Sequence, residues 1–293
     1  MSASALALVI LAGLIHACWN IAAKKAGGDS RFAAFTSIVL LVFWSPLGLW
    51  LGWQQVPGWG TAEWLLVAAS AAFHTFYYVA LLRGYRKADL TVVYPLARGS
   101  GPLLSSMAAV VLLGEHISAM GAAGIAGVVA GVFLVAGGPA LWRGAHDPLR
   151  RQRIHRGMFY GRLSGAFIAS YTVVDGYAVK VMLMSPILVD YVGSALRMVA
   201  LAPALLRDPQ TAALMWRRQW KYALVVGIIS PVSYVLVLYA MQTAPLSHVA
   251  PAREVSMLFA ALIGGQLLGE GDRLLRLAGA AFIAAGVMAL ALG

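Results

Sequence analysis

Two stretches of this sequence, 155 residues apart, indicate how the chain folds. Residues 96–115 read LARGSGPLLSSMAAVVLLGE, and residues 251–270 read PAREVSMLFAALIGGQLLGE. Both contain an Ala-Arg pair near the start and end on Leu-Leu-Gly-Glu. The same offset superposes further residues: Asn20 on Asp175, Lys25 on Lys180, Gly124 on Gly279, and Gly131-Val132 on Gly286-Val287. Matches at one common offset along the chain indicate an internal repeat.

The composition indicates the environment of the repeated segments. Of 293 residues, 61% are hydrophobic and 11% are charged, whereas an average soluble domain has about 25% charged residues. Because so little charge could not cover a soluble surface, we expect an all-α integral membrane protein. A membrane-spanning helix needs about 20 apolar residues. The ten expected transmembrane helices lie at 4–23, 32–53, 63–83, 90–113, 118–138, 160–182, 186–206, 220–241, 247–268 and 273–292.

The basic residues test this count of ten. If ten helices alternate in direction, the loops on one side hold 18 of the 22 Lys and Arg residues. These are Lys24, Lys25, Arg31, Arg83, Arg86, Lys87, Arg143, Arg150, Arg151, Arg153, Arg156, Arg162, Arg207, Arg217, Arg218, Lys221, Arg273 and Arg276. Positive loops remain in the cytoplasm, so we expect a multi-pass protein of the bacterial inner membrane with both termini periplasmic. The short basic loops also explain the net charge of +11, so no nucleic-acid partner is expected.

The spans divide the chain into two halves of five helices. Because five is an odd number, the second half enters the membrane from the opposite side. We predict a first five-helix repeat at 1–138, a basic cytoplasmic linker at 139–159 and a second five-helix repeat at 160–293. Inverted-topology repeats of this kind are typical of secondary transporters, whose substrate sites lie between the repeats near the membrane midplane.

The fourth span of each half resembles a known family. Residues 88–98 read ADLTVVYPLAR and lead to LGE at 113–115, and residues 244–251 read APLSHVAP and lead to LGE at 268–270. A glycine-rich helix follows in both halves. Together with the ten spans, this pattern resembles the EamA-type exporters of the drug/metabolite transporter superfamily, over nearly the whole chain. The resemblance implies export of amino acids, drugs or related metabolites, and its best-known members move aromatic and other neutral amino acids.

Several charged residues fall within the expected spans. A charge at the centre of a membrane helix costs about 2.5–3.5 kcal/mol, so these residues must pair or line a hydrated cavity. They are Arg98, Asp175, Arg197, Arg253 and Glu254, with Asp190 near the start of a span. Arg197 lies near the midplane, on the same helix face as Asp190. Two interpretations remain open for Arg197: an ion pair with Asp190 or Asp175, or a guanidinium that binds a substrate carboxylate.

Polar and aromatic residues also recur at helical spacing in both halves. His16 and Asn20 share one helix face, and Tyr171 and Asp175 take the equivalent positions in the second half. We therefore predict a central substrate-binding cavity, with hydrogen bonding between packed helices as the alternative. The predicted cavity residues are His16, Trp19, Asn20, His74, Tyr78, Tyr94, Arg98, Tyr171, Asp175, Arg197, Tyr234 and Arg253.

Several of the expected spans contain prolines or glycines. Pro102, Pro231 and Pro251 remove backbone hydrogen bonds and kink their helices. Such breaks can expose carbonyls to a ligand or can be static packing features. A set of glycines in the fifth and tenth spans is predicted to let these helices approach closely: Gly124, Gly127, Gly131, Gly279 and Gly286.

The sequence contains no catalytic pattern and no phosphate-binding glycine loop with a lysine. We therefore expect neither an enzyme nor a bound cofactor. The single cysteine, Cys18, and the scattered histidines predict no disulfide and no metal site. Expected partners are a small-molecule substrate and the lipid bilayer, and the chain is compatible with a monomer.

The expected function is a secondary transporter that exports small metabolites, foremost neutral or aromatic amino acids, by alternating access. One alternative is a multidrug or organic-cation exporter. It is disfavoured because the small four-helix relatives use a carboxylate in their first helix, where this chain has His16 and Asn20. Another alternative is a non-transporting membrane scaffold or lipid-modifying protein. Proton coupling through Asp175, His16 or His74 and facilitated diffusion both remain open.

Overall fold

The protein is all helical in the part of the chain that the structure describes. The computed structural model describes the backbone of residues 1–293 except 89, 136–137, 139–147 and 261–272. The expected all-α membrane fold is confirmed. Five helices are each long and apolar enough to cross a membrane. They are α1 (Ala3–Ala26), α4 (Thr61–Lys87), α5 (Leu90–Leu113), α8 (Pro186–Leu206) and α9 (Pro209–Thr243).

The expected second span is a bent helix pair. Helix α2 (Ser30–Phe43) and helix α3 (Ser45–Gln55) meet at an angle of 70°, and the short helix η1 (Val56–Gly58) follows. Pro46 lies in the first turn of α3. Proline has no N–H for the bond to the preceding turn, and its ring clashes with that turn, so the helix bends there. The pair still satisfies the length and hydropathy of one span.

The remaining expected spans coincide with α6 (Ala119–Val135), α7 (Pro148–Lys180), α10 (Leu246–Ala252) and α12 (Arg273–Leu292). Helix α7 begins at Pro148 rather than at 160, so it occupies part of the expected linker. The ninth span is interrupted: α10 ends at Ala252, and the chain is helical again at 255–260 before the described residues stop.

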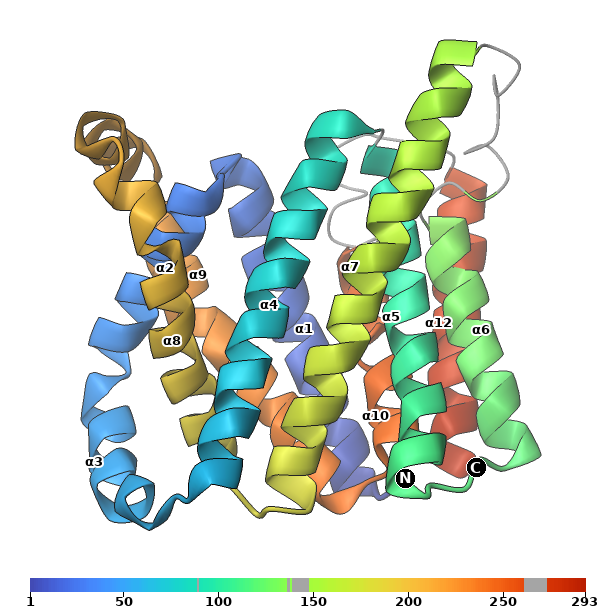
Figure 1. The fold of residues 1–293 in the computed structure, drawn as a ribbon. Coiled ribbons are helices and arrows are strands. Elements are labelled where there is room, and N and C mark those ends of the chain that lie inside the picture. Colours follow the sequence, from blue (N-terminus) through green and yellow to red (C-terminus); the bar gives the residue numbers. More distant parts are fainter. Residues whose placement is uncertain (89, 136–137, 139–147, 261–272) are drawn as a thin grey trace.

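The two halves pack as inverted repeats. Figure 1 shows the N- and C-termini at the same end of the helix bundle, as an even number of crossings requires. Helix α4 packs along α7, and α9 packs along α1. The 155-residue offset converts each of these pairs into the other. Contacts that exchange partners in this way are those expected for two equivalent halves facing opposite directions.

Glycine pairs join the last helices of the two halves, as the sequence predicts. A Cβ atom added at Gly131 would lie 2.6 Å from the carbonyl oxygen of Gly279, and one at Gly124 would lie 2.8 Å from that of Gly286. No side chain fits at such distances. The two pairs are equivalent under the repeat, so α6 and α12 contact each other through the same backbone surfaces.

Packing closes the end of the bundle that holds the two termini. The largest buried apolar cluster includes Val9, Ala240, Met241, Leu246 and Ile283. These residues come from α1, α9, α10 and α12, so both halves contribute. Burial of apolar side chains is the main favourable term in such packing, and helix interfaces in a membrane depend on the closeness of that fit.

A carboxylate joins the two halves at this same end. Glu115 follows α5, and its Oε1 accepts hydrogen bonds from Lys180 Nζ at 2.9 Å and from the backbone N–H of Leu246 at 2.8 Å. Its Oε2 accepts from the backbone N–H of Ser247 at 2.9 Å. Lys180 Nζ also donates to the carbonyl of Ala244 at 3.2 Å. Burial by itself would raise the pKa of the Glu115 carboxyl, but the hydrogen bonds from Ser247, Lys180 and Leu246 outweigh burial and hold that pKa below its ordinary value.

Candidate functional site

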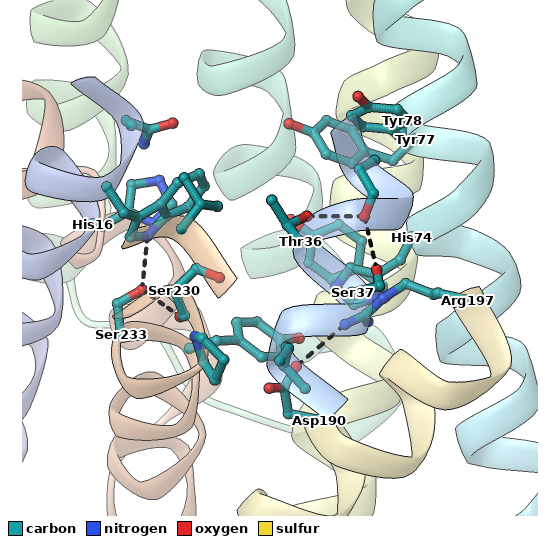
Figure 2. A pocket seen from close by; sticks show the side chains of 18 of the residues that line it. His16, Thr36, Ser37, His74, Tyr77, Tyr78, Asp190, Arg197, Ser230 and Ser233 are labelled. Carbon is teal, nitrogen blue, oxygen red and sulfur yellow. Dashed lines mark hydrogen bonds and ion pairs between the residues drawn. The ribbon is translucent and has the colours of Figure 1, made fainter. Parts of the chain in front are cut away.

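A cavity of about 320 Å³ lies between the two halves. Its walls come from α1, α2, α4 and α5 of the first half and from α7, α8, α9 and Arg253 of the second. Figure 2 shows side chains from several of these helices pointing into one space. Lining residues such as Asn20, Ala33 and Leu201 lie toward the end where α1 joins α2 and α8 joins α9. The cavity therefore extends from the middle of the bundle toward the end opposite the termini.

The structure brings most of the predicted cavity residues together. Those that line the cavity are His16, Trp19, Asn20, His74, Tyr78, Arg98, Tyr171, Arg197, Tyr234 and Arg253. Asp175 is buried behind the wall rather than in it. The side chain of Tyr94 lies outside the described residues. Whether these residues bind a substrate stays a prediction.

The α1 wall is fixed by an aromatic pair. The rings of His16 and Trp19 meet edge to face, with centroids 4.6 Å apart. Trp19 Nε1 donates a hydrogen bond to Ser233 Oγ at 3.2 Å, and the Ser233 hydroxyl donates to the carbonyl of Ser230 at 3.0 Å. Ser230 lies one residue before Pro231 on α9. This chain of contacts couples a first-half helix to the kinked helix of the second half.

A second aromatic group links α4, α7 and α9. His74 stacks on Tyr171 with ring centroids 3.8 Å apart, and it meets Tyr234 edge to face at 5.6 Å. His74 Nδ1 lies 2.9 Å from the carbonyl oxygen of Ser70. Because a carbonyl can only accept, Nδ1 carries the proton, which leaves Nε2 as the acceptor in a neutral ring. The Tyr234 hydroxyl donates to Asp175 Oδ2. Asp175 therefore contacts a residue that lines the cavity but does not line the cavity itself.

The Arg197 guanidinium is held within α8. Its Nη2 lies 3.3 Å from Asp190 Oδ1 and 2.5 Å from Ser194 Oγ. Figure 2 shows Arg197 and Asp190 pointing toward each other at one end of the cavity. Of the two interpretations left open by the sequence, the ion pair with Asp190 is therefore present, although Arg197 still lines the cavity.

The Arg98 guanidinium pairs across the repeat interface. Its Nη2 lies 2.9 Å from Glu254 Oε2 and donates to Ser256 Oγ at 3.0 Å. The Glu254 side chain is 1% exposed. A buried carboxylate requires a partner, and Arg98 supplies it. Sequence proximity gave no hint of this pairing, because the residue adjacent to Glu254 is a different arginine.

That adjacent arginine, Arg253, has much weaker contacts. Its Nε lies 3.8 Å from Glu254 Oε1, and its guanidinium carbon lies 5.9 Å from the centre of the Tyr171 ring. The Arg253 side chain donates no hydrogen bond to any described residue. The side chain is 11% exposed, and it lines the cavity.

The helix is interrupted just before Arg253, where the sequence has a proline. Pro251 lies inside α10 and cannot donate to the carbonyl of Ser247 one turn earlier. The Ser106 hydroxyl donates to that carbonyl instead, at 2.9 Å. The helix then ends at Ala252, and Arg253 and Glu254 occupy the turn. Leu96 replaces Pro251 in the first half, where α5 runs without a break.

Some cavity residues were missed at the level of sequence. Thr36, Ser37 and Thr75 line the cavity. Thr36 and Ser37 both donate to the carbonyl of Ala33, at 2.9 and 3.0 Å, and Thr75 donates to that of Ala71 at 2.8 Å. Hydroxyls satisfied within their own helix are common in membrane proteins, so sequence alone does not separate cavity residues from packing residues. Polar residues in otherwise apolar runs were the available signal.

One further hydrogen bond connects two helices at the end of the cavity near the α1–α2 connection. The Tyr78 hydroxyl donates to the carbonyl of Asp29 at 2.7 Å. This bond connects α4 to the residue that caps α2. No cluster of metal-ligating side chains occurs among the residues that were searched, namely those the structure describes.

Both the fold and the sequence resemble those of known proteins. A crystal structure of a protein with 15% sequence identity has a similar fold, with a TM-score of 0.76 and a match that covers 100% of this chain and 98% of that chain. At that identity the likeness concerns the fold alone. No protein with a curated description matches the sequence. The model of the EamA-like transporter family matches residues 3–137 and again residues 155–292. Because the two matches together span most of the chain, the protein belongs to the EamA-like transporter family of multi-pass membrane proteins.

Proposed function

We propose that the protein exports neutral or aromatic amino acids from the cytoplasm by alternating access between its two halves. The observation that supports this most directly is the cavity, because it lies at the interface of two inverted repeats. Movement of one half against the other would expose such a site to each side of the membrane in turn. The closed end contains the Glu115 hydrogen bonds, and the other end contains the cavity.

The lining favours a small zwitterion. The cavity volume of about 320 Å³ lies at the lower end of the roughly 300–1,000 Å³ common for ligand pockets. Aromatic rings of His74, Tyr171 and Tyr234 offer apolar faces for a side chain. Such faces also attract an ammonium group. A guanidinium for the carboxylate and aromatic faces for the ammonium group suit a molecule that bears both charges.

The competing organic-cation function has less support. A cation exporter needs a carboxylate that is free to meet the substrate. Among the residues that the structure describes, the three carboxylates in or behind the cavity walls are already bound: Asp190 to Arg197, Glu254 to Arg98 and Asp175 to Tyr234. A cation would have to displace one of these partners, whereas a carboxylate would not.

Orientation follows from the basic loops rather than from the cavity. With the basic loops in the cytoplasm, the cavity faces the cytoplasm, and both termini lie in the periplasm of a bacterial inner membrane. We place the repeats at 1–138 and 160–293, with the basic segment 139–159 between them, although α7 begins within that segment. The partners are then the transported molecule and the bilayer.

Transport by the purified protein tests this function. Proteoliposomes loaded with unlabelled phenylalanine or leucine should take up the labelled amino acid by exchange, and protein-free liposomes should not. Uptake of an organic cation such as tetraphenylphosphonium, with no exchange of any neutral amino acid, would replace this proposal by the cation-exporter function. An imposed pH gradient that accelerates net uptake would show proton coupling, and unchanged rates would indicate facilitated diffusion.

A further inference from the structure

We propose that Arg253 binds the carboxylate of the transported molecule and thereby selects amino acids over amines and amides of the same shape. This inference rests on the proposed function, since it assigns one residue of the same cavity a specific contact. It differs from the expectation drawn from the sequence, in which Arg197 was the leading guanidinium.

The three arginines that line the cavity differ in their partners. Arg98 is bound to Glu254 and Ser256, at 2.9 and 3.0 Å. Arg197 is bound by Asp190 at 3.3 Å and by a serine of its own helix. A substrate that approached either one would have to compete with a bound partner. The Arg253 side chain, by contrast, donates no hydrogen bond to any described residue.

The charges around Arg253 favour an anionic ligand. Arg98 and Arg253 share one carboxylate, that of Glu254, which lies 2.9 Å from Arg98 and 3.8 Å from Arg253. Among the described residues, Glu254 is the carboxylate within 4 Å of these two guanidinium groups, it lies closer to Arg98, and the three side chains are at most 11% exposed. Leaving a buried charge without a partner is costly. A substrate carboxylate would supply the missing negative charge and fit the planar guanidinium through two parallel hydrogen bonds.

Arg253 also lies near the aromatic residues of the cavity wall. Arg253 lies in the turn where α10 ends, between α10 and the helical residues 255–260. Its guanidinium carbon is 5.9 Å from the Tyr171 ring, and His74 stacks on that ring. A carboxylate at Arg253 would therefore place the rest of an amino acid beside the aromatic wall. The equivalent residue in the first half, Arg98, lies in an unbroken helix and is paired with Glu254 and Ser256.

The experiment compares substrates as well as variants. Exchange in proteoliposomes is measured for labelled phenylalanine in competition with unlabelled phenylalanine, phenylalaninamide and phenethylamine, in the wild-type protein and in Arg253→Ala, Arg253→Lys and Arg151→Ala. Arg151 is an exposed residue near the start of α7 and serves as the matched arginine control. Gel filtration and thermal unfolding establish that each variant is folded.

The wild-type protein should prefer phenylalanine over its amide by about 10- to 100-fold in half-inhibitory concentration, the range for a hydrogen-bonded charge pair. Arg253→Ala should raise KM for phenylalanine by a similar factor and abolish the preference. Arg253→Lys should fall between, because it keeps the charge and loses the planar fork. Arg151→Ala should behave as wild type. A residue with only a structural role would change the amount of folded protein without changing this preference.

Two results would overturn the inference and leave the function intact. In one, the wild-type protein exchanges phenylalanine and phenylalaninamide equally well. In the other, Arg253→Ala, or Arg253→Lys if the alanine variant does not fold, keeps both the wild-type KM and the wild-type preference. A wild-type protein that exchanges no amino acid would overturn the proposed function, and this inference with it.

Discussion

Replacement of Glu115 by glutamine should destabilise the protein substantially, although the change removes one charge and little volume. Two backbone N–H groups and the Lys180 ammonium converge on the two oxygens of this carboxylate. Glutamine keeps one accepting oxygen and replaces the other by an NH₂ group, which cannot accept. One of the N–H groups at the start of α10 then loses its partner.

The magnitude follows from these contacts. An unsatisfied donor with little access to solvent costs about 1–3 kcal/mol. The ion pair adds about 1 kcal/mol at most, because Lys180 is 31% exposed and solvent screens it. The expected loss is about 2–3 kcal/mol, which corresponds to roughly 4–10 °C in Tm for a chain of this size.

Thermal unfolding of the detergent-purified protein measures this loss. Glu63→Gln is the matched control, since Glu63 also accepts a backbone N–H, that of Gly60 at 2.9 Å, but does so in an exposed turn. The control should melt close to wild type. If Glu115→Gln melts within one or two degrees of Glu63→Gln, on the order of the exposed-pair contribution, the proposed importance of this carboxylate in holding the two halves together is refuted.

Three further predictions concern stability. The Glu115 pKa is held below its ordinary value, so the stabilisation is complete above about pH 4.3 and is lost as the pH falls through the lowered pKa; the Tm difference between wild type and Glu115→Gln should shrink on acidification. Arg197→Ala should cost about 3–5 kcal/mol because Asp190 remains buried and unpaired, and adding Asp190→Ala should recover part of the Tm. Gly286→Ala should lower Tm because its Cβ would lie 2.7 Å from a backbone oxygen of α6, whereas Gly52→Ala, with its nearest neighbour at 3.9 Å, should be tolerated; equal Tm values for these two would contradict the close contact of α6 and α12.

Much of the fold was accessible from the sequence because the relevant signals are local or repeated. Hydropathy located the spans, and the 155-residue offset paired Gly124 with Gly279 before any contact was known. The bend before Pro46 and the early start of α7 at Pro148 escaped prediction. Both occur where proline permits a helix to begin, and hydropathy windows do not report helix starts.

The partners of the charged residues were harder to predict. Arg197 and Asp190 lie seven residues apart on one helix, so helical geometry was enough to suggest their pairing. Arg98 and Glu254 belong to different halves, and only their proximity in the folded structure reveals the pair. Glu254 directly follows Arg253 in the sequence, but adjacent helical positions point about 100° apart, so this adjacency does not predict an ion pair. Distances between helices are set by packing, which the sequence does not display.

The glycine contact between α6 and α12 has a thermodynamic consequence. Exchange of the two halves maps the Gly124–Gly286 pair onto Gly279–Gly131, so under the proposed alternating access these glycine contacts are the same when each half takes the other's conformation. An element that is the same in both states cannot favour either of them. Any preference for one resting state must therefore originate where the halves differ chemically, and Pro251, which replaces the Leu96 of the first half, is such a place. Substitution at that position should bias occupancy between the two states, while the two glycine contacts favour neither state.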